Sequence, residues 1–185
     1  MRTFVAIELD KHAKDVIFNM QSKIKDNLFG VKWVEYENLH ITLKFLGDVN
    51  GQRIEDVKEA ILKVSSQFDY FKIKGGSIGA FPTPERARVI FFNIEDGKDV
   101  IYRIFENLEH KLSILGFERD KRSYHPHITI GRVKRGVQDI KKFLYLKADF
   151  TTNATGLTLF KSTLTPNGPK YTKIITGAFK WKKTL

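Results

Sequence analysis

The chain contains no cysteine among its 185 residues. This absence excludes disulfide bonds, thiolate nucleophiles and zinc sites built from cysteine. No stretch approaches the roughly 20 apolar residues needed to span a bilayer. The N-terminus also lacks a secretory layout, because its apolar run is short and Glu8 and Asp10 follow at once. The sequence therefore predicts a cytoplasmic protein that has no membrane partner.

Acidic residues are outnumbered, with 21 Asp and Glu against 32 Lys and Arg, which gives a formal net charge of +11. This balance favours a polyanionic partner such as RNA or DNA, although lysines also serve simply as a solvated surface. An apolar fraction of 42% argues against disorder. We expect residues 1–185 to form a single domain with two lobes.

One short pattern occurs twice in the chain. Residues 40–43 read His-Ile-Thr-Leu, and residues 127–130 read His-Ile-Thr-Ile. In a β-strand, side chains alternate between the two faces, so each histidine projects beside its threonine while the aliphatic residues point the other way. Each segment would therefore present an imidazole and a hydroxyl together, anchored from behind by buried residues.

The pattern belongs to a longer repeat, at about residues 3–47 and 87–132. In each copy the sequence predicts a hydrophobic strand and an amphipathic helix, with a glycine near the helix end, followed by the strand that carries His-x-Thr. Two such halves facing each other across a cleft would bring both histidines together. The predicted segments are strand 3–7, helix 11–28, Gly30 and strand 39–46 in the first copy, and strand 87–94, helix 98–115, Gly116 and strand 127–130 in the second.

The remaining segments are predicted from periodicity and turn residues. They are strand 31–34, helix 53–64, extended residues 71–81 with a bend at Gly75-Gly76, a short basic helix at 138–147, and strands 157–164 and 171–181 around a loop at 165–169.

Two imidazoles suit a reaction that needs one general base and one general acid, because histidine titrates near neutrality. His40 and His127 are the candidates. Thr42 and Thr129 would donate hydroxyl hydrogen bonds to an anionic oxygen, and Arg132 carries the guanidinium best matched to a phosphate. Each of these residues also has an ordinary structural interpretation, and the duplication favours the functional one.

Other residues leave alternatives open. Simple strand alternation places Lys44 beside His40, where it could add positive charge. The His125-Pro-His127 segment could supply two ligands to a metal-dependent phosphodiesterase, although no carboxylate lies within four residues. A third possibility is an RNA-binding module without turnover. Four aromatic residues could stack on bases or simply pack: Phe4, Tyr36, Tyr124 and Tyr171.

With these motifs, the sequence resembles the two-histidine (2H) phosphoesterases, and within them the RNA 2′,3′-cyclic phosphodiesterases, also called 2′-5′ RNA ligases. The resemblance extends over essentially the whole chain. Besides the two motifs it includes residues 2–7, 43–47, 131–132 and 161–164.

The resemblance implies a bilobal α+β fold of LigT-like type, with two antiparallel-sheet lobes, helices on the outside, a pseudo-two-fold axis and a central basic cleft. His40 would be the proton donor, His127 the proton acceptor, and Thr42, Thr129 and Arg132 would hold the phosphate. No metal or other cofactor is implied.

The implied reaction converts RNA 2′,3′-cyclic phosphate ends, such as those of tRNA fragments, into 2′-phosphomonoesters. The reverse 2′-5′ ligation is an accompanying option. The expected working unit is a monomer.

Overall fold

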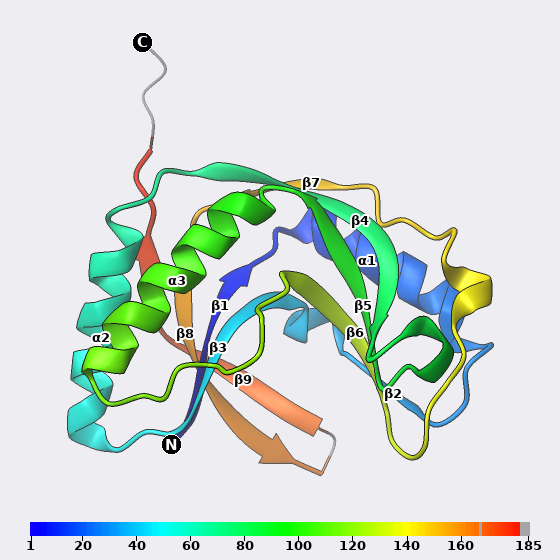
Figure 1. Ribbon diagram of the computed structural model, residues 1–185, viewed down its shortest axis with the longest axis horizontal. Helices are drawn as coiled ribbons and strands as arrows, with labels where there is room; N and C mark the ends of the chain where they lie inside the picture. Colours follow the sequence, from blue (N-terminus) through cyan, green and yellow to red (C-terminus); the bar gives the residue numbers. More distant parts are fainter. Residues whose placement is uncertain (167, 182–185) are drawn as a thin grey trace.

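The computed structural model describes residues 1–166 and 168–181, which form two antiparallel sheets and three α-helices (Figure 1). The first sheet has the strand order β3-β1-β8-β9, with β1 at Arg2–Glu8, β3 at His40–Asp48, β8 at Gly156–Thr165 and β9 at Gly168–Ala178. The second has the order β2-β6-β5-β4-β7, with β2 at Val31–Trp33, β4 at Phe71–Phe81, β5 at Val89–Asp96, β6 at His127–Val133 and β7 at Thr151–Ala154. Within these residues, no helix combines the length and apolar character required to cross a membrane.

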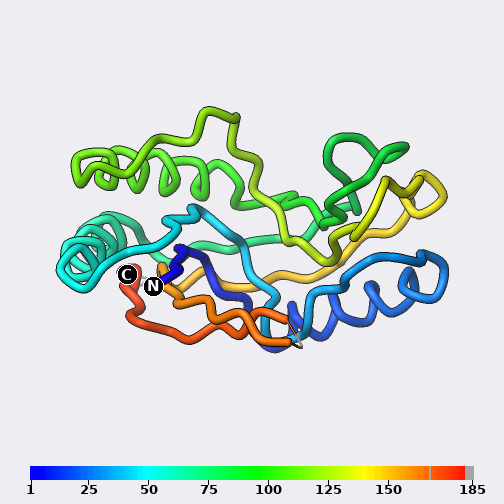
Figure 2. The backbone as a smooth tube through the Cα atoms, turned by 90° about the horizontal axis from the view of Figure 1, so that it is seen from below, coloured from blue at the N-terminus to red at the C-terminus, as the bar shows by residue number. Residues whose placement is uncertain are grey.

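The helices cross from one sheet to the other. The helix α1 (Lys11–Lys25) follows β1 of the first sheet, yet it packs on the second sheet, where it contacts β7. The helix α3 (Lys98–Ile114) follows β5 of the second sheet and packs against β3 and α2 (Gly51–Ser65), and α2 in turn contacts β8 and β9 of the first. Figure 2 shows α1 at one end of the molecule and the α2–α3 pair at the other. Each motif strand is therefore backed by a helix from the other half of the chain.

Aliphatic side chains from both sheets and all three of these helices form one continuous core. Ile41 and Ile128, which separate histidine from threonine in the two motifs, are fully buried in it. Their burial anchors each motif from behind, and the neighbouring histidine and threonine remain half-buried on the opposite face. The alternation expected for a strand thus holds across each His-x-Thr segment.

Both motif strands contain a β-bulge immediately after the threonine. The ladder between β1 and β3 passes over Leu43, and the ladder between β5 and β6 passes over Ile130. An extra residue on one strand shifts the alternation of faces for the residues that follow. Lys44 consequently lies on the core side together with Leu43, and the expectation that its side chain lies beside His40 is wrong.

Most predicted segments are observed as elements, with one wrong helix, one missed strand and some shifted element ends. The segment 138–147 forms only a single 3₁₀ turn at Lys141–Phe143, because it pairs with the irregular part of β4 instead: Ile78 N–H donates to the Leu146 carbonyl. The strand β7 was missed, and α1 ends three residues before the predicted residue 28. Thr165 belongs to β8, and Gly168 and Pro169 belong to β9, so three residues of the predicted loop 165–169 lie in strands, and residue 167 lies outside the described residues.

Gln21 of α1 provides a test of how the bulge in β6 is supported. Its side chain is 2% exposed and donates from Nε2 to the carbonyls of Val34 (2.9 Å) and Ile130 (2.7 Å). Gln21→Leu should lower the free energy of unfolding by about 2 kcal/mol, since buried carbonyls lose their donor. Gln52→Leu, at an exposed position of α2, should change it by less than about 0.5 kcal/mol. Urea unfolding measures both, and equal effects would contradict the role of Gln21.

Candidate active site

The two motif histidines are held in the same way. Nδ1 of His40 lies 2.7 Å from the carbonyl of Asn38, and Nδ1 of His127 lies 2.6 Å from the carbonyl of His125. A carbonyl oxygen only accepts, so Nδ1 is the protonated nitrogen in both rings. In each neutral imidazole, Nε2 then carries the lone pair and is the atom that can accept a proton. In both motifs, the backbone carbonyl two residues before the histidine fixes this tautomer.

Each histidine also lies against a pair of phenylalanine rings from two adjacent interior strands of its sheet. These rings are substantially buried, so the interpretation of Phe4 as packing rather than base stacking is the correct one. They surround each imidazole with apolar surface, which disfavours its charged form. The ring-centroid distances are 5.0 Å for His40–Phe4, 6.3 Å for His40–Phe160, 5.0 Å for His127–Phe91 and 5.2 Å for His127–Phe81.

Burial lowers the pKa of His40 to about 4, and the nearby positive charges of Lys14 and Arg132 act in the same direction. Burial also lowers the pKa of His127. His40 is therefore neutral in the free protein near pH 7. Its unprotonated Nε2 lies 2.8 Å from the hydroxyl of Thr42, which donates the hydrogen bond between them.

The bulge turns Gly131 toward the core side of β6, so the next residue, Arg132, is exposed on the opposite face. A side chain at Gly131 would collide with β2, since a Cβ there would approach Val31 and Trp33 to 2.8 and 3.0 Å. The charge of Arg132 depresses the pKa of both motif histidines, so its guanidinium is close to the two strands that carry them. Thr129 lies half-buried on the same face of β6.

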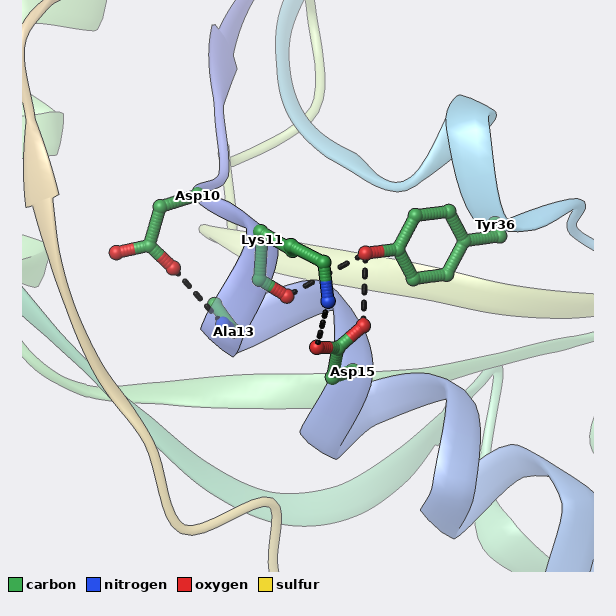
Figure 3. A network of polar contacts seen from close by, with 5 residues as sticks. All are labelled: Asp10, Lys11, Ala13, Asp15 and Tyr36. Carbon is green, nitrogen blue, oxygen red and sulfur yellow. Dashed lines mark hydrogen bonds and ion pairs between the residues drawn. The ribbon is translucent and has the colours of Figure 1, made fainter.

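The segment before His40 is positioned by the first turn of α1. Asp10 caps this helix, its side chain accepting from the Ala13 N–H at 2.8 Å, and Figure 3 shows the contacts beside it. The hydroxyl of Tyr36 donates to Asp15 Oδ1 at 2.8 Å. Tyr36 begins the 3₁₀ turn that ends at Asn38, whose carbonyl holds the His40 ring. Tyr36 thus links α1 to the turn that supports the His40 ring.

Lys44 binds the segment that leads to the second motif, residues 115–126, which we call loop 115–126. Its ammonium pairs with the carboxylate of Glu109 on α3 and donates to the Glu118 carbonyl at 2.8 Å. Glu109 in turn accepts from the Asp120 N–H at 2.9 Å. Lys44 and Glu109 are only 6% and 4% exposed. The buried pair therefore anchors the largely exposed loop to β3 and α3 instead of offering charge to a ligand.

Tyr124 makes the second attachment of this loop. Its hydroxyl donates to the Thr42 carbonyl at 2.9 Å, and its ring stacks on Phe105 of α3 with centroids 4.2 Å apart. The side chain is consequently a packing residue, one of the two interpretations that the sequence left open. Through it the loop before His127 is bonded to the strand that carries His40.

A cleft of about 660 Å³ adjoins His127 and is walled by loop 115–126. Arg88 and Arg122 line it, and neither residue stands out among the many cations of the sequence. A smaller pocket of about 210 Å³ lies beside Arg132 and includes Asn38 and Tyr171. His127 thus borders a ligand-sized space with two arginines, and the smaller pocket includes Tyr171, whose ring centroid is 5.6 Å from that of His40.

The two histidines of the His125-Pro-His127 segment do not join a larger set of metal ligands. Among the described residues, no group of three His, Cys, Asp or Glu side chains is arranged to hold a metal ion. Nε2 of His125 lies instead 2.8 Å from Oδ1 of Asn93.

Two antiparallel-sheet lobes that present paired histidines beside basic pockets are the architecture of the two-histidine phosphoesterases, as the resemblance implied. The chain belongs to the family described as LigT like phosphoesterase, which matches residues 7–91 and 94–171. The family resemblance stated from the sequence is therefore confirmed, and the protein is an enzyme of the phosphoesterase class.

Relatives in other organisms match nearly the whole chain. It is 41% identical over 178 residues to an RNA 2′,3′-cyclic phosphodiesterase of Methanocaldococcus jannaschii, covering 92% of this chain and 96% of the relative. A protein of the same description from Thermotoga maritima is 34% identical over 174 residues, with 92% and 91% covered.

Solved structures confirm the predicted bilobal α+β fold. TT0787 of Thermus thermophilus superimposes with a TM-score of 0.86 at 24% identity, covering 98% of this chain and 100% of that one. Escherichia coli LigT complexed with 3′-AMP gives a TM-score of 0.77 at 21% identity, covering 96% and 97%.

The lowered pKa of His40 predicts a pH dependence of stability. The unfolded chain binds a proton at this residue near pH 6.5 and the folded chain only near pH 4, so acid favours the unfolded state. The stabilisation by neutral His40 is complete above about pH 6.5 and should be lost as the pH falls through 6.5 toward 4.

NMR of the imidazole nitrogens should find the His40 ring neutral at pH 5.5. A His40→Gln variant should lose less unfolding free energy over this pH window, whereas His12→Gln, at an exposed position of α1, should behave as the parent protein. A His40 ring that titrates near its ordinary value would contradict the burial argument.

Lys44→Met should leave the Glu109 carboxylate buried without its cation and lower the unfolding free energy by about 3 to 5 kcal/mol. The double variant Lys44→Met/Glu109→Met should recover most of this loss, because apolar side chains replace buried ion pairs well. Lys58→Met, which breaks the exposed pair with Glu55, should cost less than about 1 kcal/mol. Denaturant unfolding tests the series, and equal costs for Lys44→Met and Lys58→Met would refute it.

Proposed function

We propose that the protein hydrolyses the 2′,3′-cyclic phosphate at RNA ends to a 2′-phosphomonoester, without a metal ion. The observation that carries this proposal is the matched pair of imidazoles, each with Nδ1–H bonded to a backbone carbonyl and Nε2 available. The names of the relatives, RNA 2′,3′-cyclic phosphodiesterase, support the same substrate class.

In this reaction a water oxygen bonds to phosphorus while the bond from phosphorus to the ribose 3′ oxygen breaks. Nε2 of His127 takes the proton of the water, and Nε2 of His40 delivers a proton to the departing oxygen. The two groups must act from opposite sides of phosphorus, which suits histidines on two separate strands. The residues alone do not distinguish donor from acceptor, and this assignment follows the family resemblance.

The donor role requires a protonated His40, although its pKa in the free protein is about 4. An anionic phosphate beside the ring favours the imidazolium and raises this pKa, so the proton arrives with the substrate. Once Nε2 carries a proton, the Thr42 hydroxyl no longer donates to it and can donate to a phosphate oxygen. Thr129 has the equivalent position beside His127.

Arg132 supplies the fixed charge that such a phosphate needs, and its planar guanidinium can bind two phosphate oxygens at once. With a 5′-hydroxyl in place of water, the same two groups would join the cyclic phosphate to that hydroxyl while the bond to the 3′ oxygen breaks, giving the 2′-5′ linkage. We propose that tRNA fragments with such ends are among the substrates. One copy of the chain carries both motif strands, so we propose a monomer as the working unit; the cytoplasmic location stays a prediction.

His40→Ala and His127→Ala should each reduce turnover by roughly 10² to 10⁴, the usual contribution of one general acid or base. An oligonucleotide that ends in a 2′,3′-cyclic phosphate serves as substrate, and ³¹P NMR identifies the phosphomonoester formed. His12→Ala, on the exposed side of α1, is the matched control and should keep full activity. Full activity of either motif variant would refute the assignment.

The same assay separates the two alternatives. A metal-dependent phosphodiesterase would lose activity in EDTA, whereas the proposed mechanism predicts an unchanged rate. A binding module would retain salt-sensitive RNA binding and form no product.

A further inference from the structure

A second pocket adjoins the proposed active site on the other side of His125. Its volume is about 450 Å³, and it lies between β4, β5 and the start of α3. His125 lines both this pocket and the 660 Å³ cleft beside His127, so its ring forms a shared boundary. The side chains that carry the argument below are Ser77, Asn93, Glu95, Lys98 and Lys147.

The boundary itself is held firmly. Asn93 accepts at Oδ1 from Nε2 of His125 at 2.8 Å and donates from Nδ2 to the Ser77 carbonyl at 2.9 Å. The imidazole also lies 5.7 Å from the Phe81 ring and 5.6 Å from the Phe91 ring, measured between centroids. The proposed reaction uses only the backbone carbonyl of His125, so its side chain and the pocket behind it have no role in that chemistry.

The pocket offers positive charge. Lys147 is paired with Glu95 at 2.6 Å, and Lys74 also approaches this carboxylate at 3.4 Å. Lys98, the first residue of α3, forms no salt bridge within the described residues, and its ammonium is close enough to lower the pKa of His125 alongside burial. A free ammonium beside a polar pocket suits a phosphate group.

We propose that this pocket is a second nucleotide subsite, which receives the nucleotide that precedes the cyclic phosphate end, with Lys98 contacting the phosphodiester between them. The inference rests on the proposed function. The terminal nucleoside occupies the cleft that contains His127, because its cyclic phosphate must reach that ring. The RNA chain then continues past His125 into the adjoining pocket. The preferred substrate is therefore an oligonucleotide rather than a free cyclic mononucleotide.

Steady-state kinetics with two substrates tests the proposal. One is adenosine 2′,3′-cyclic phosphate, and the other is the dinucleotide ApA ending in a 2′,3′-cyclic phosphate. Lys98→Glu should raise KM for the dinucleotide by about fivefold or more and weaken its salt dependence, because one phosphate contact is lost. It should leave the mononucleotide kinetics unchanged. A carboxylate in the first turn of a helix is favourable, so α3 should stay folded.

Lys23→Glu is the matched control, since it makes the same charge change on an exposed position of α1. It should alter neither substrate. Equal changes for both substrates in Lys98→Glu would indicate only a general electrostatic effect and overturn the subsite, as would an unchanged dinucleotide KM. In both cases the wild-type protein still turns over the mononucleotide, and the proposed function survives. If the wild-type protein hydrolyses neither substrate, the proposed function and the subsite are both refuted.

Discussion

The buried ion pair between Lys44 and Glu109 is the constraint on which the assembled site depends. Two charges taken out of water are tolerated only when they satisfy each other and the surrounding polar groups. Here the pair also binds the backbone of loop 115–126 at Glu118 and Asp120. The strand that carries His40, the helix α3 and the loop that leads to His127 must therefore come together in one arrangement. Lys44, which follows the His40 motif, thus secures the wall of the cleft beside His127.

The site is built twice from the same local parts. In each half, a backbone carbonyl fixes the imidazole tautomer, two phenylalanines lie against the ring and a bulge follows the threonine. We interpret these parallels as the structural form of the internal repeat proposed over residues 3–47 and 87–132. The halves differ after the bulge: the first continues with buried Lys44 and then Phe45, which is 64% exposed, and the second with Gly131 and Arg132. Only the second half therefore places an exposed cation directly after its bulge, where Arg132 lines the smaller pocket.

The sequence was informative where a feature depends on neighbours along the chain. Alternation within a strand placed each histidine beside its threonine, and helical spacing located the three helices. It failed where the outcome depends on a partner strand. The bulge at Leu43 arises from pairing with β1 and moved Lys44 into the core. Pairing with β4 likewise prevented a helix at 138–147. Arg88 and Arg122 could not be selected from sequence, because only the folding of loop 115–126 brings them to one cleft.

The apolar surroundings of the two imidazoles control when these rings can be protonated. Rings packed against phenylalanine are disfavoured as cations, so the free site holds His40 neutral, and its hydrogen bond from Thr42 reinforces that state. A fixed cation such as Arg132 makes a second positive charge still less favourable. Only an anion bound between β3 and β6 would favour the charged form of His40 over the neutral one. In the proposed mechanism, the protonated form of His40 therefore forms preferentially when a phosphate is present, and the same anion frees the Thr42 hydroxyl to donate to it. Desolvation by the phenylalanine pair beside His40 would thus link phosphate binding to the protonation that the proposed mechanism requires.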